Sequence, residues 1–378
     1  MNSKIIIVGS GLFGLTIAER IASTLNKEVL ILEKRPHIGG NAWSEFDAQT
    51  GIEIHKYGSH LFHTSNEGVW NYVNQFTKFN DYQHHVWTKH KNQLYPIPIN
   101  LGTISQYFGK SLSPFEAKNL ILNETKKLGK IDTSNFEGIA LKSIGEALYN
   151  AFIKGYTHKQ WQLDPKQLPA EIFTRLPLRF DLNTRYFSDK YEGLPLDGYQ
   201  RFIQNIANNK LIKIEVDTDY FQLKPEIKLN SLVIYTGPID RYFNYKYGEL
   251  KWRTLDFEIE KLDIDDFQGT SVMNYADIDV NFTRIHEFQH LHPERLKLSE
   301  KTIIMKEYSR LSSQGDEPYY PVNSRQDREI LQKYREEILT LKNVIFGGRL
   351  GTYKYLDMHM AIASALNVFE NQVKPRFI

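Results

Sequence analysis

The sequence predicts an α/β protein in which a Rossmann-like dinucleotide-binding domain carries an inserted helical-bundle domain and an antiparallel β-sheet domain. Three observations lead to this fold class. A β-branched run and a glycine-rich turn open the chain at residues 5–14, apolar residues recur at helical spacing between residues 113 and 154, and residues 250–310 alternate as strands do. Short apolar runs at 212–216, 232–235 and 344–346 resemble parallel strands that return to the first domain.

The N-terminal segment has the order strand, glycine turn, helix. Ile5–Val8 is expected to be a buried parallel strand, after which Gly9, Gly11 and Gly14 turn the chain into a helix. Gly11 lets the backbone approach a pyrophosphate at the helix N-terminus, and Gly14 lets helix and strand pack closely. A chance glycine turn is the less favoured interpretation because strand and helix are both in place.

The second strand and a further glycine pair indicate which dinucleotide is bound. Val29–Leu32 is the expected strand, and Glu33 ends it about 20 residues beyond the glycines, where a carboxylate accepts the ribose hydroxyls. The adjacent pair Gly39–Gly40 favours FAD over a nicotinamide cofactor, because many FAD-binding proteins pass the chain under the dinucleotide again at this point. An ordinary turn is the alternative.

The remaining elements follow from caps, prolines and periodicity. Val86–Pro98 is strand-like, and its two prolines suggest an edge. Ser113, followed by Pro114 and Glu116, forms a capping box for a helix that runs to Leu128. The other expected elements are a helix over about 138–154, a helix from Asn323 or Ser324 to about Leu341, a buried strand Val344–Phe346, and a helix beginning near Tyr355.

These elements suggest a division into domains. The FAD-binding domain is expected at 1–82, 200–240 and 340–378, and the helical domain at 101–172 with a mobile loop near 165–180. The antiparallel sheet domain takes 83–100, 173–199 and 241–320, and residues 321–339 form a connecting helix.

Composition narrows the possible partners. The 378 residues contain 47 Lys and Arg against 45 Asp and Glu, a net charge of +2, so no basic field or basic run indicates nucleic acid or a membrane surface. Cysteine is absent, which excludes disulfides and thiolate metal sites and fits a reducing cytosol. The first strand begins within four residues and no apolar stretch approaches the ~20 residues of a membrane span, so a cytoplasmic protein is expected.

Three segments carry residues suited to a nucleotide. Residues 152–161 place Phe152, Tyr156, Thr157 and Trp161 around a polar turn, as a uracil base needs, although aromatics at helix ends usually pack on a neighbouring element. Arg175 and Arg284 have the planar fork that holds a diphosphate with two hydrogen bonds, although isolated arginines are most often surface residues. The stretch 347–357 repeats the strand, glycine and helix order of the N-terminus; a plain connection is the alternative.

Other catalytic devices are missing from the sequence. His60 and His63 lie in a histidine-containing stretch, but no carboxylate completes a metal-ligand spacing nearby, so no metal is expected. No nucleophile elbow, P-loop or H-E-x-x-H motif is found, so the chemistry is assigned to the cofactor.

Together these motifs resemble the bacterial UDP-galactopyranose mutases over the whole length of the chain. The blocks that carry the resemblance are Gly39–Ala42, Tyr57–Thr64, Tyr156–Trp161, Phe282–Arg284, Pro318–Pro321 and Gly348–Asp357, in the family order. The family commonly has Pro where this chain has Ser59 and Tyr where it has Trp43. Neither departure removes a contact group.

The resemblance implies a substrate site, a cofactor site and catalytic residues. It places the nucleotide-sugar near His84, Phe152, Tyr156, Thr157, Trp161, Arg175, Tyr186, Asn274, Arg284, Tyr320 and Tyr355. It places FAD near Gly9, Gly11, Phe13, Gly14, Glu33, Lys34, Gly40, Asn41, His60, Leu61, Val216, Gly348, Arg349, Leu356, Asp357 and Met358. The implied catalytic residues are Arg175, Arg284 and His60.

The implied reaction interconverts UDP-galactopyranose and UDP-galactofuranose for cell-surface polysaccharide synthesis. N5 of reduced FAD attacks the anomeric carbon and expels UDP, with no net redox change. NAD(P)H or another reductant, a homodimer, and an N-acetylated or other UDP-sugar are compatible expectations. The rival functions are an amine-oxidase-like oxidoreductase and a non-catalytic binding module on the same scaffold, such as a GDP-dissociation inhibitor.

Overall fold

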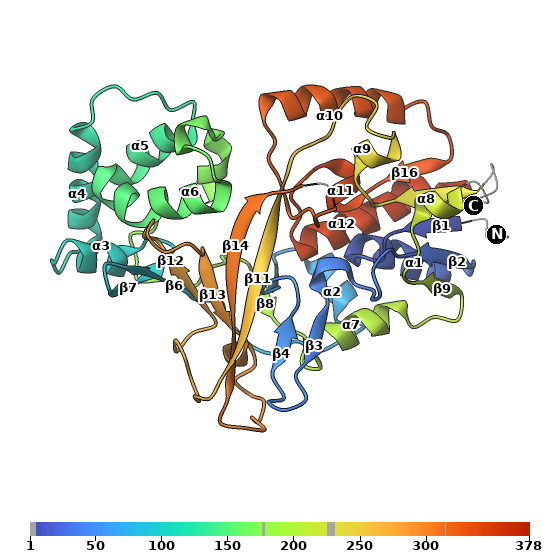
Figure 1. Ribbon diagram of the computed structural model, residues 1–378, viewed down its shortest axis with the longest axis horizontal. Helices are drawn as coiled ribbons and strands as arrows, with labels where there is room; N and C mark the ends of the chain where they lie inside the picture. Colours follow the sequence, from blue (N-terminus) through green and yellow to red (C-terminus); the bar gives the residue numbers. More distant parts are fainter. Residues whose placement is uncertain (1–4, 176–177, 225–230, 314) are drawn as a thin grey trace.

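The computed structural model describes residues 5–175, 178–224, 231–313 and 315–378, with only the backbone at 174–175. Within these residues the chain forms a five-stranded sheet, a seven-stranded sheet and two short strand pairs. Figure 1 shows the seven-stranded sheet between a helical group at one end of the molecule and the five-stranded sheet with its helices at the other. The predicted fold class is confirmed.

The five-stranded sheet is parallel and has the order β16-β10-β1-β2-β9. Its strands are β1 Ile5–Val8, β2 Val29–Leu32, β9 Ile212–Glu215, β10 Leu232–Tyr235 and β16 Val344–Phe346. All five match runs that the sequence marks as strands. Strands from three separate stretches of the chain therefore build one sheet, as expected for a discontinuous dinucleotide-binding fold.

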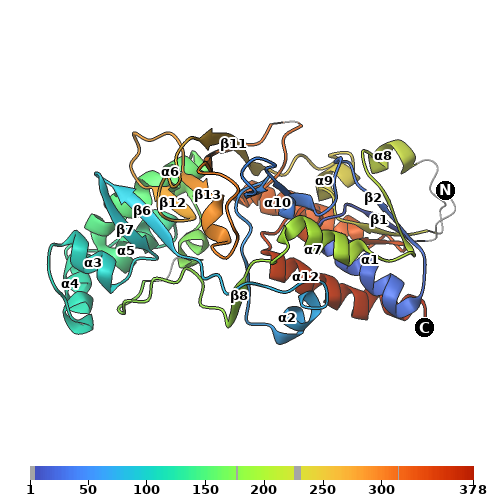
Figure 2. The ribbon, with the colours of Figure 1, turned by 90° about the horizontal axis from the view of Figure 1, so that it is seen from below.

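Both faces of this sheet are covered. One face packs its alternate residues, among them Ile5, Ile7 and Ile31, against the helices α1 Leu12–Leu25, α7 Gly198–Ala207 and α12 Met358–Val368. The other face, which includes Ile6 and Val8, meets α8 Tyr220–Leu223 and α9 Ile239–Tyr242. In Figure 2 the two sets of helices lie on opposite sides of the strands. Burial on both faces explains the continuous apolar runs in these strands.

The seven-stranded sheet has the order β15-β11-β14-β13-β12-β6-β7, and only its β12–β6 pair is parallel among the described strands. Its strands are β6 Val86–His90, β7 Gln93–Ile97, β11 Trp252–Leu262, β12 Val272–Tyr275, β13 Arg284–Glu287, β14 Thr302–Leu311 and β15 Tyr320–Pro321. The largely antiparallel sheet expected over residues 250–310 is confirmed, and the stretch after residue 82 joins it.

The strand-like stretch Val86–Pro98 is a hairpin and not a continuous strand. Lys91 and Asn92 turn the chain between β6 and β7 with φ of 47° and 61°. Positive φ at both turn residues is the geometry that matches the twist of two-residue hairpins. The edge position predicted from the prolines is correct for β7, which contains Pro96.

The helical group contains α3 Leu101–Tyr107, α4 Pro114–Lys126, α5 Phe136–Leu148 and α6 Gly155–Trp161, with a π-helical turn η2 at Tyr149–Lys154 between the last two. The capping box of Ser113 and Glu116 is present at the start of α4. Phe136, Ile144 and Leu148 belong to a separate buried core that the group shares with β7 residue Tyr95. The helical group thus has its own hydrophobic core.

The remaining segments connect these parts. β3 Ser44–Phe46 pairs with β4 Glu53–His55, and β5 Phe62–Thr64 pairs with β8 Tyr191–Gly193. The sequence division placed residues 173–199 in the domain of the seven-stranded sheet, but β8 is not a strand of that sheet. Ser324 caps α10 Arg325–Ile338, which ends three residues before the expected Leu341. The other helices and turns are α2 Glu67–Val73, α11 Gly348–Thr352, η1 Gly40–Ala42, η3 Pro165–Gln167, η4 Ala170–Arg175, η6 Phe288–Leu291, η7 Phe369–Val373 and η8 Lys374–Arg376.

The C-terminal helix begins later than the sequence predicts. The helix expected near Tyr355 begins at Met358, because α11 occupies Gly348–Thr352 first. None of the helices in the described ranges is long and apolar enough to cross a membrane. The proposed domain boundaries and the mobility of the 165–180 loop, part of which lies outside the described residues, stay predictions.

A buried lysine fastens the helical group to the seven-stranded sheet. Lys159, on α6, donates to the backbone carbonyls of Tyr275, Asp277 and Phe282 at 2.7–3.0 Å. The three carbonyls lie in the β12–β13 connection and at the end of β12. Burial lowers the pKa of Lys159 to about 8. A single ammonium therefore satisfies three acceptors and fixes α6 beside the sheet.

We predict that Lys159→Met lowers the free energy of unfolding by about 3 kcal/mol, because buried acceptors lose their donor at a cost of roughly 1–3 kcal/mol each. Urea denaturation of the apoprotein measures the change. Lys166→Met is the matched control, since the Lys166 side chain is 67% exposed and its ion pair with Glu137 is long, at 3.7 Å. Equal unfolding free energies for the two variants would contradict the role of Lys159.

Candidate functional site

A cavity of about 830 Å³ opens at the carboxyl ends of β1, β2 and β10. The strand-end residues Val8, Leu32 and Tyr235 contribute to its wall. Ligands of open parallel sheets bind at this edge, and the volume falls in the usual range of small-molecule sites. The cavity is thus where the sequence predicts the dinucleotide.

Most of the residues predicted to bind the cofactor line this cavity. They are Gly9, Gly11, Phe13, Gly14, Glu33, Lys34, Gly40, Asn41, His60, Gly348, Arg349, Leu356 and Met358. Leu61, Val216 and Asp357 do not line it, and Val216 is an exposed residue at the end of β9. Residues that the sequence analysis did not select also line the cavity, among them Arg35, Thr218, Thr236 and Glu317.

The glycines leave room for a ligand where backbone segments cross. A Cβ on Gly11 would have nothing within 4 Å, so this residue faces the open cavity. A Cβ on Gly14 would overlap the carbonyl oxygen of Gly9, and one on Gly40 would lie 3.1 Å from the Cα of Gly11. Gly11 and Gly39 form a parallel bridge. The backbone therefore forms a cradle without side chains, and this fits the diphosphate of FAD.

Glu33 is buried at the far side of this cradle and is held by hydrogen bonds. Its Oε2 accepts from the backbone N and the Oγ of Ser10 at 2.8 and 2.6 Å, and its Oε1 accepts from the backbone N of Arg35 at 2.9 Å. Oε1, which accepts a single bond from the described residues, keeps further acceptor capacity. A fixed carboxylate at this point fits the ribose of the adenosine half.

The cavity residues missed by the sequence analysis have simple sequence signals. Arg35 lies two residues after Glu33, and its guanidinium donates to Asn41 Oδ1 at 2.9 Å and to Glu317 at 2.6 Å. Thr236 directly follows β10, the neighbour of β1, and its Oγ1 donates to the carbonyl of Val8 at 2.7 Å. The end of each parallel strand is the signal that would have located both.

His60 lies at the cavity in a defined neutral form. Its Nδ1 is 2.7 Å from the carbonyl oxygen of Gly58, which can only accept, so Nδ1 carries the proton. Burial lowers the pKa of His60 to about 4. Its Nε2 is therefore an unprotonated acceptor at neutral pH.

The predicted arginine Arg284 begins β13 and lies in a row of side chains across the seven-stranded sheet. Its partner in the ladder to β12 is Asn274, and its partner in the ladder to β14 is Glu307. Directly opposed residues project to the same face of a sheet. The Oδ1 of Asn274 is buried and has no hydrogen-bond partner among the described residues.

Arg284 is paired with a buried carboxylate and touches a tyrosine. Its Nε lies 3.4 Å from Oε1 of Glu307, a side chain with 4% exposure, and its NH2 donates to the hydroxyl of Tyr156 on α6. Burial alone would raise the pKa of Glu307, but Arg284 and then His286 lower it to about 2. The site therefore contains an ionised pair of a buried carboxylate and an arginine whose side chain is 30% exposed.

Aromatic side chains link Arg284 to the cavity wall. Tyr186 and Tyr320 both lie near Arg284. The rings of Tyr320 and Tyr355 stack with centroids 5.7 Å apart, and the guanidinium of Arg349, a cavity residue, lies 5.1 Å from the Tyr355 ring. These residues connect the predicted substrate site with the predicted cofactor site.

Other predicted substrate residues are less directly placed. His84 is buried and packs edge-on against Tyr186 at 5.4 Å. Phe152 is buried in the core of the helical group, edge-on to Tyr95 and Tyr107, which is the packing alternative considered from the sequence. Thr157 is buried on α6, Trp161 packs at the edge of the same core, and the side chain of Arg175 lies outside the described residues.

A second cavity, of about 860 Å³, lies beside the helical group. Gly155 and His158 of α6, residues 275–280, and the lysines at 89, 91, 154 and 166 line it. None of the predicted substrate residues lines this cavity. Its mixed charges, with Glu137, Asp164 and two further aspartates, favour no particular ligand.

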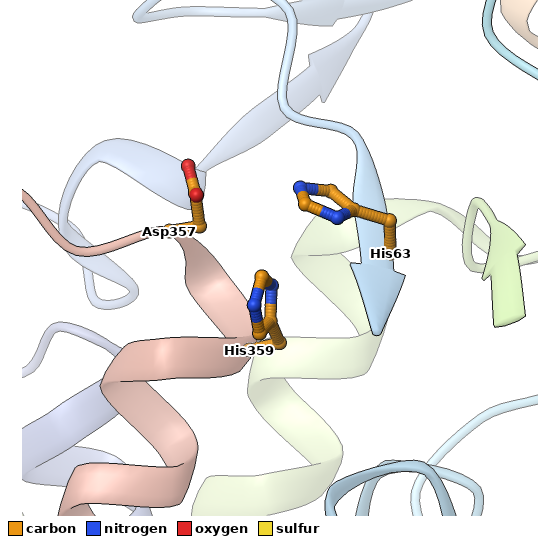
Figure 3. A group of neighbouring side chains, drawn as sticks. All are labelled: His63, Asp357 and His359. Carbon is orange, nitrogen blue, oxygen red and sulfur yellow. The ribbon is translucent and has the colours of Figure 1, made fainter. Parts of the chain in front are cut away.

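The fold brings Asp357 and His359 close to His63 of the histidine-containing stretch. His63, Asp357 and His359 each offer one ligand atom within 4.8 Å of the others, and Figure 3 shows the three side chains around one space. His63 Nδ1 is bonded to Asp189 at 2.7 Å, and its ring stacks on Phe187. The expectation that no metal is bound considered only residues close to His63 in the sequence, whereas Asp357 and His359 come from the N-terminus of α12. The absence of a metal stays a prediction.

We predict that Gly11→Ala weakens FAD binding at least roughly tenfold, equivalent to about 1.4 kcal/mol, while the apoprotein keeps its stability. The added methyl would enter open cavity space, and Gly11 has an ordinary φ of −62°. Fluorescence titration with FAD and urea denaturation of the apoprotein measure the two effects. Gly14→Ala is the contrasting variant, because its methyl overlaps backbone and should destabilise the apoprotein itself. Normal FAD affinity in Gly11→Ala would refute the cradle.

Comparison with known proteins identifies the family. A family model described as UDP-galactopyranose mutase matches residues 151–355, and one for an NAD(P)-binding Rossmann-like domain matches residues 7–76. The chain is 44% identical to a probable UDP-galactopyranose mutase of Klebsiella pneumoniae, over 97% of this chain and 93% of that protein. It is 40% identical to the dTDP-fucopyranose mutase of Escherichia coli, over 98% of this chain and 99% of that protein.

A solved structure supports the same conclusion at the level of the fold. The crystal structure of a reduced UDP-galactopyranose mutase superposes with a TM-score of 0.76 at 15% identity, over 99% of this chain and 94% of that one. The resemblance drawn from the sequence is confirmed, FAD is the cofactor, and the comparisons do not support the rival functions. The chain belongs to the UDP-galactopyranose mutase family and is a flavin-dependent mutase.

Proposed function

We propose that this chain interconverts UDP-galactopyranose and UDP-galactofuranose. The observation that carries the proposal is the position of Arg284, which is held by buried Glu307, touches Tyr156 and is linked through Tyr320 and Tyr355 to the FAD cavity. Bound and reduced FAD supplies the nucleophilic N5 for the reaction at the anomeric carbon, without net redox change. The protein must therefore bind the diphosphate of the departing UDP next to the flavin.

Arg284 suits this task because its charge is fixed before the substrate arrives. Glu307 compensates the charge of the guanidinium from the protein side, while the partly exposed Arg284 side chain is available to diphosphate oxygens. Negative charge grows on those oxygens as UDP departs, so the contact strengthens in the transition state. Arg175 is the proposed second contact, on the segment that leads out of the helical group. Closure of this segment would keep water out and retain UDP.

The nucleotide is proposed to lie between α6 and the sheet. Tyr156 provides a ring, Thr157 and Trp161 follow on the same helix, and Asn274 presents an unpartnered amide oxygen beside Arg284. Phe152 is proposed to support this surface from the core behind it. Tyr186, Tyr320, Tyr355 and His84 would surround the sugar and the diphosphate.

The cofactor and reaction residues are proposed on the same basis. FAD would contact the thirteen predicted residues of the cavity wall, with Leu61, Val216 and Asp357 as more peripheral contacts. The unprotonated Nε2 of His60 is proposed to act as a hydrogen-bond acceptor near the flavin ring. NAD(P)H or another reductant is proposed to reduce the flavin, and a cytoplasmic homodimer serving cell-surface polysaccharide synthesis is the proposed setting.

A second candidate substrate is dTDP-fucopyranose. The observation that favours it is the 40% identity, over nearly the full length, to a relative named dTDP-fucopyranose mutase. The two nucleotides share the diphosphate and differ at the 2′-hydroxyl and at the 5-methyl group of the base. Arg284 serves both, so the choice depends on the surface around α6.

We predict that the purified protein is yellow and interconverts UDP-galactopyranose and UDP-galactofuranose only after reduction by dithionite or NAD(P)H. Chromatography of the sugar nucleotides measures turnover with UDP-galactose, its N-acetylated form and dTDP-fucose in parallel. A larger kcat/KM for dTDP-fucose would replace the first candidate by the second. Stoichiometric consumption of an electron acceptor, or activity without reduction, would contradict both.

We predict that Arg284→Ala lowers kcat by about 10² to 10³ while FAD stays bound, by analogy with the loss of one oxyanion-stabilising donor. Lys at this position should restore activity only in part, because an ammonium keeps the charge and loses the two-pronged geometry. Arg175→Ala should behave alike. Arg325→Ala is the control, since its side chain is 90% exposed on α10. Near wild-type rates in flavin-loaded Arg284→Ala would disprove the assignment.

A further inference from the structure

The loop that carries His60 makes contacts in two directions. His60 lies at the FAD cavity, and its neighbour Ser59 has its Oγ 2.7 Å from Nδ1 of His286 on β13. Gly58 has a φ of 89°, and a Cβ built there would be in ordinary van der Waals contact with the ring of Phe257 at 3.5 Å and with Oε2 of Glu307 at 3.8 Å. The loop therefore lies beside the buried carboxylate that holds Arg284 and reaches it through His286.

The direction of each hydrogen bond in this region follows from its partners. Nε2 of His286 lies 3.1 Å from Oε2 of Glu307, and an ionised carboxylate only accepts, so Nε2 carries the proton. His286 is buried and its pKa is lowered by burial, so its Nδ1 is unprotonated. The Nδ1 atom must then accept the hydroxyl proton of Ser59. One tautomer of His286 satisfies both neighbours.

These hydrogen bonds and the Arg284–Glu307 ion pair form a continuous chain of side chains. It runs from Ser59 to His286, from His286 to Glu307, from Glu307 to Arg284, and ends at the hydroxyl of Tyr156. Arg284 and His286 are two residues apart on β13 and thus face the same side, with Glu307 opposite Arg284 in the ladder. Thr283 adds a hydroxyl 3.3 Å from Oε1 of Glu307.

We propose that Ser59 and His286 are positioning residues that couple the His60 loop at the cofactor cavity to Arg284 at the substrate diphosphate. This inference rests on the proposed function for the role of Arg284. The Ser59 hydroxyl keeps His286 in the tautomer that donates to Oε2 of Glu307, and Glu307 in turn fixes the guanidinium. Movement of the loop at the flavin therefore changes the orientation of the diphosphate-binding group.

Removal of the Ser59 hydroxyl should alter how firmly the Arg284 guanidinium is held in position. Without that donor, Nδ1 of buried His286 is an unsatisfied acceptor, and the tautomer that no longer donates to Glu307 becomes accessible. Glu307 then loses one of its hydrogen-bond donors, and its carboxylate fixes the Arg284 guanidinium less firmly. The fold should remain intact, because Ser59 is partly exposed.

A double-mutant cycle on flavin-loaded, full-length protein tests the coupling. Titration calorimetry with UDP and turnover of the sugar nucleotide are measured for Ser59→Ala, Arg284→Lys and the double variant. We expect Ser59→Ala to weaken UDP binding about 3- to 10-fold, the usual consequence of losing one buried hydrogen bond. In the Arg284→Lys background the same change should have less than roughly a 1.5-fold effect, since coupled residues are not additive.

Controls separate positioning from general destabilisation. Ser59→Thr keeps a hydroxyl and should restore UDP affinity to within about twofold of wild type, as expected if the hydroxyl is the active group. Ser143→Ala removes a serine hydroxyl that donates to the Ile139 carbonyl within α5, and it should change neither UDP affinity nor turnover. If Ser59→Ala fails to retain flavin, the nearly isosteric Ser59→Cys, a weak donor, replaces it in the cycle.

The outcomes are distinguishable. Equal effects of the Ser59 change in both backgrounds, with wild-type turnover intact, would overturn the coupling and leave the proposed function standing. Failure of Ser59→Thr to recover affinity would also overturn it. A wild-type protein that neither binds UDP nor converts any tested sugar nucleotide would overturn the proposed function, and the inference with it.

Discussion

The structure depends on a place at the carboxyl end of β1 where backbone segments meet without side chains between them. A Cβ on Gly14 would overlap the carbonyl of Gly9, one on Gly39 would overlap Ile203 of α7, and one on Gly347 would overlap the ring of Phe13. The N-terminal turn, α7 and the end of β16 can therefore come together only because these positions are glycine. The same condition that closes the fold leaves Gly11 facing open space, so the packing of the domain and the cofactor cavity have one cause.

The elements that the sequence predicts well are those whose signals are local. The five parallel strands are continuous apolar runs because both faces of their sheet are buried, and Ser113 and Ser324 start helices with side-chain caps. The hairpin of β6 and β7 was not resolved from its sequence because Lys91 and Asn92 adopt positive φ without a glycine. The pairing of β8 with β5 was also missed, since it joins segments far apart in the chain and leaves no local mark.

The same distinction applies to the site. The cofactor side could be predicted because glycines and an acid follow directly after strands, and strand ends meet at one edge of the sheet. The substrate side depends on register: Asn274, Arg284 and Glu307 form a row only after three strands are aligned. Glu307 drew no attention in the sequence, where it is one of many charges in an alternating strand. The family motifs identify Arg284 as a site residue, but they do not identify Glu307, the buried carboxylate that holds it.

The free-energy cost of burying the Arg284–Glu307 ion pair indicates that the pair serves function more than stability. Removing two charges from water costs free energy that their attraction offsets only with good geometry and further hydrogen bonds, so a buried ion pair is weak evidence for a stabilising role. Here Glu307 receives donors from Thr283 and His286, and both serve to keep it ionised. A guanidinium compensated in this way does not need to rearrange when a diphosphate arrives or when charge develops on it. Because the diphosphate is common to uridine and thymidine nucleotides, this device leaves the choice of nucleotide to other residues. The catalytic half of the site can thus stay constant while the surface around α6 sets specificity.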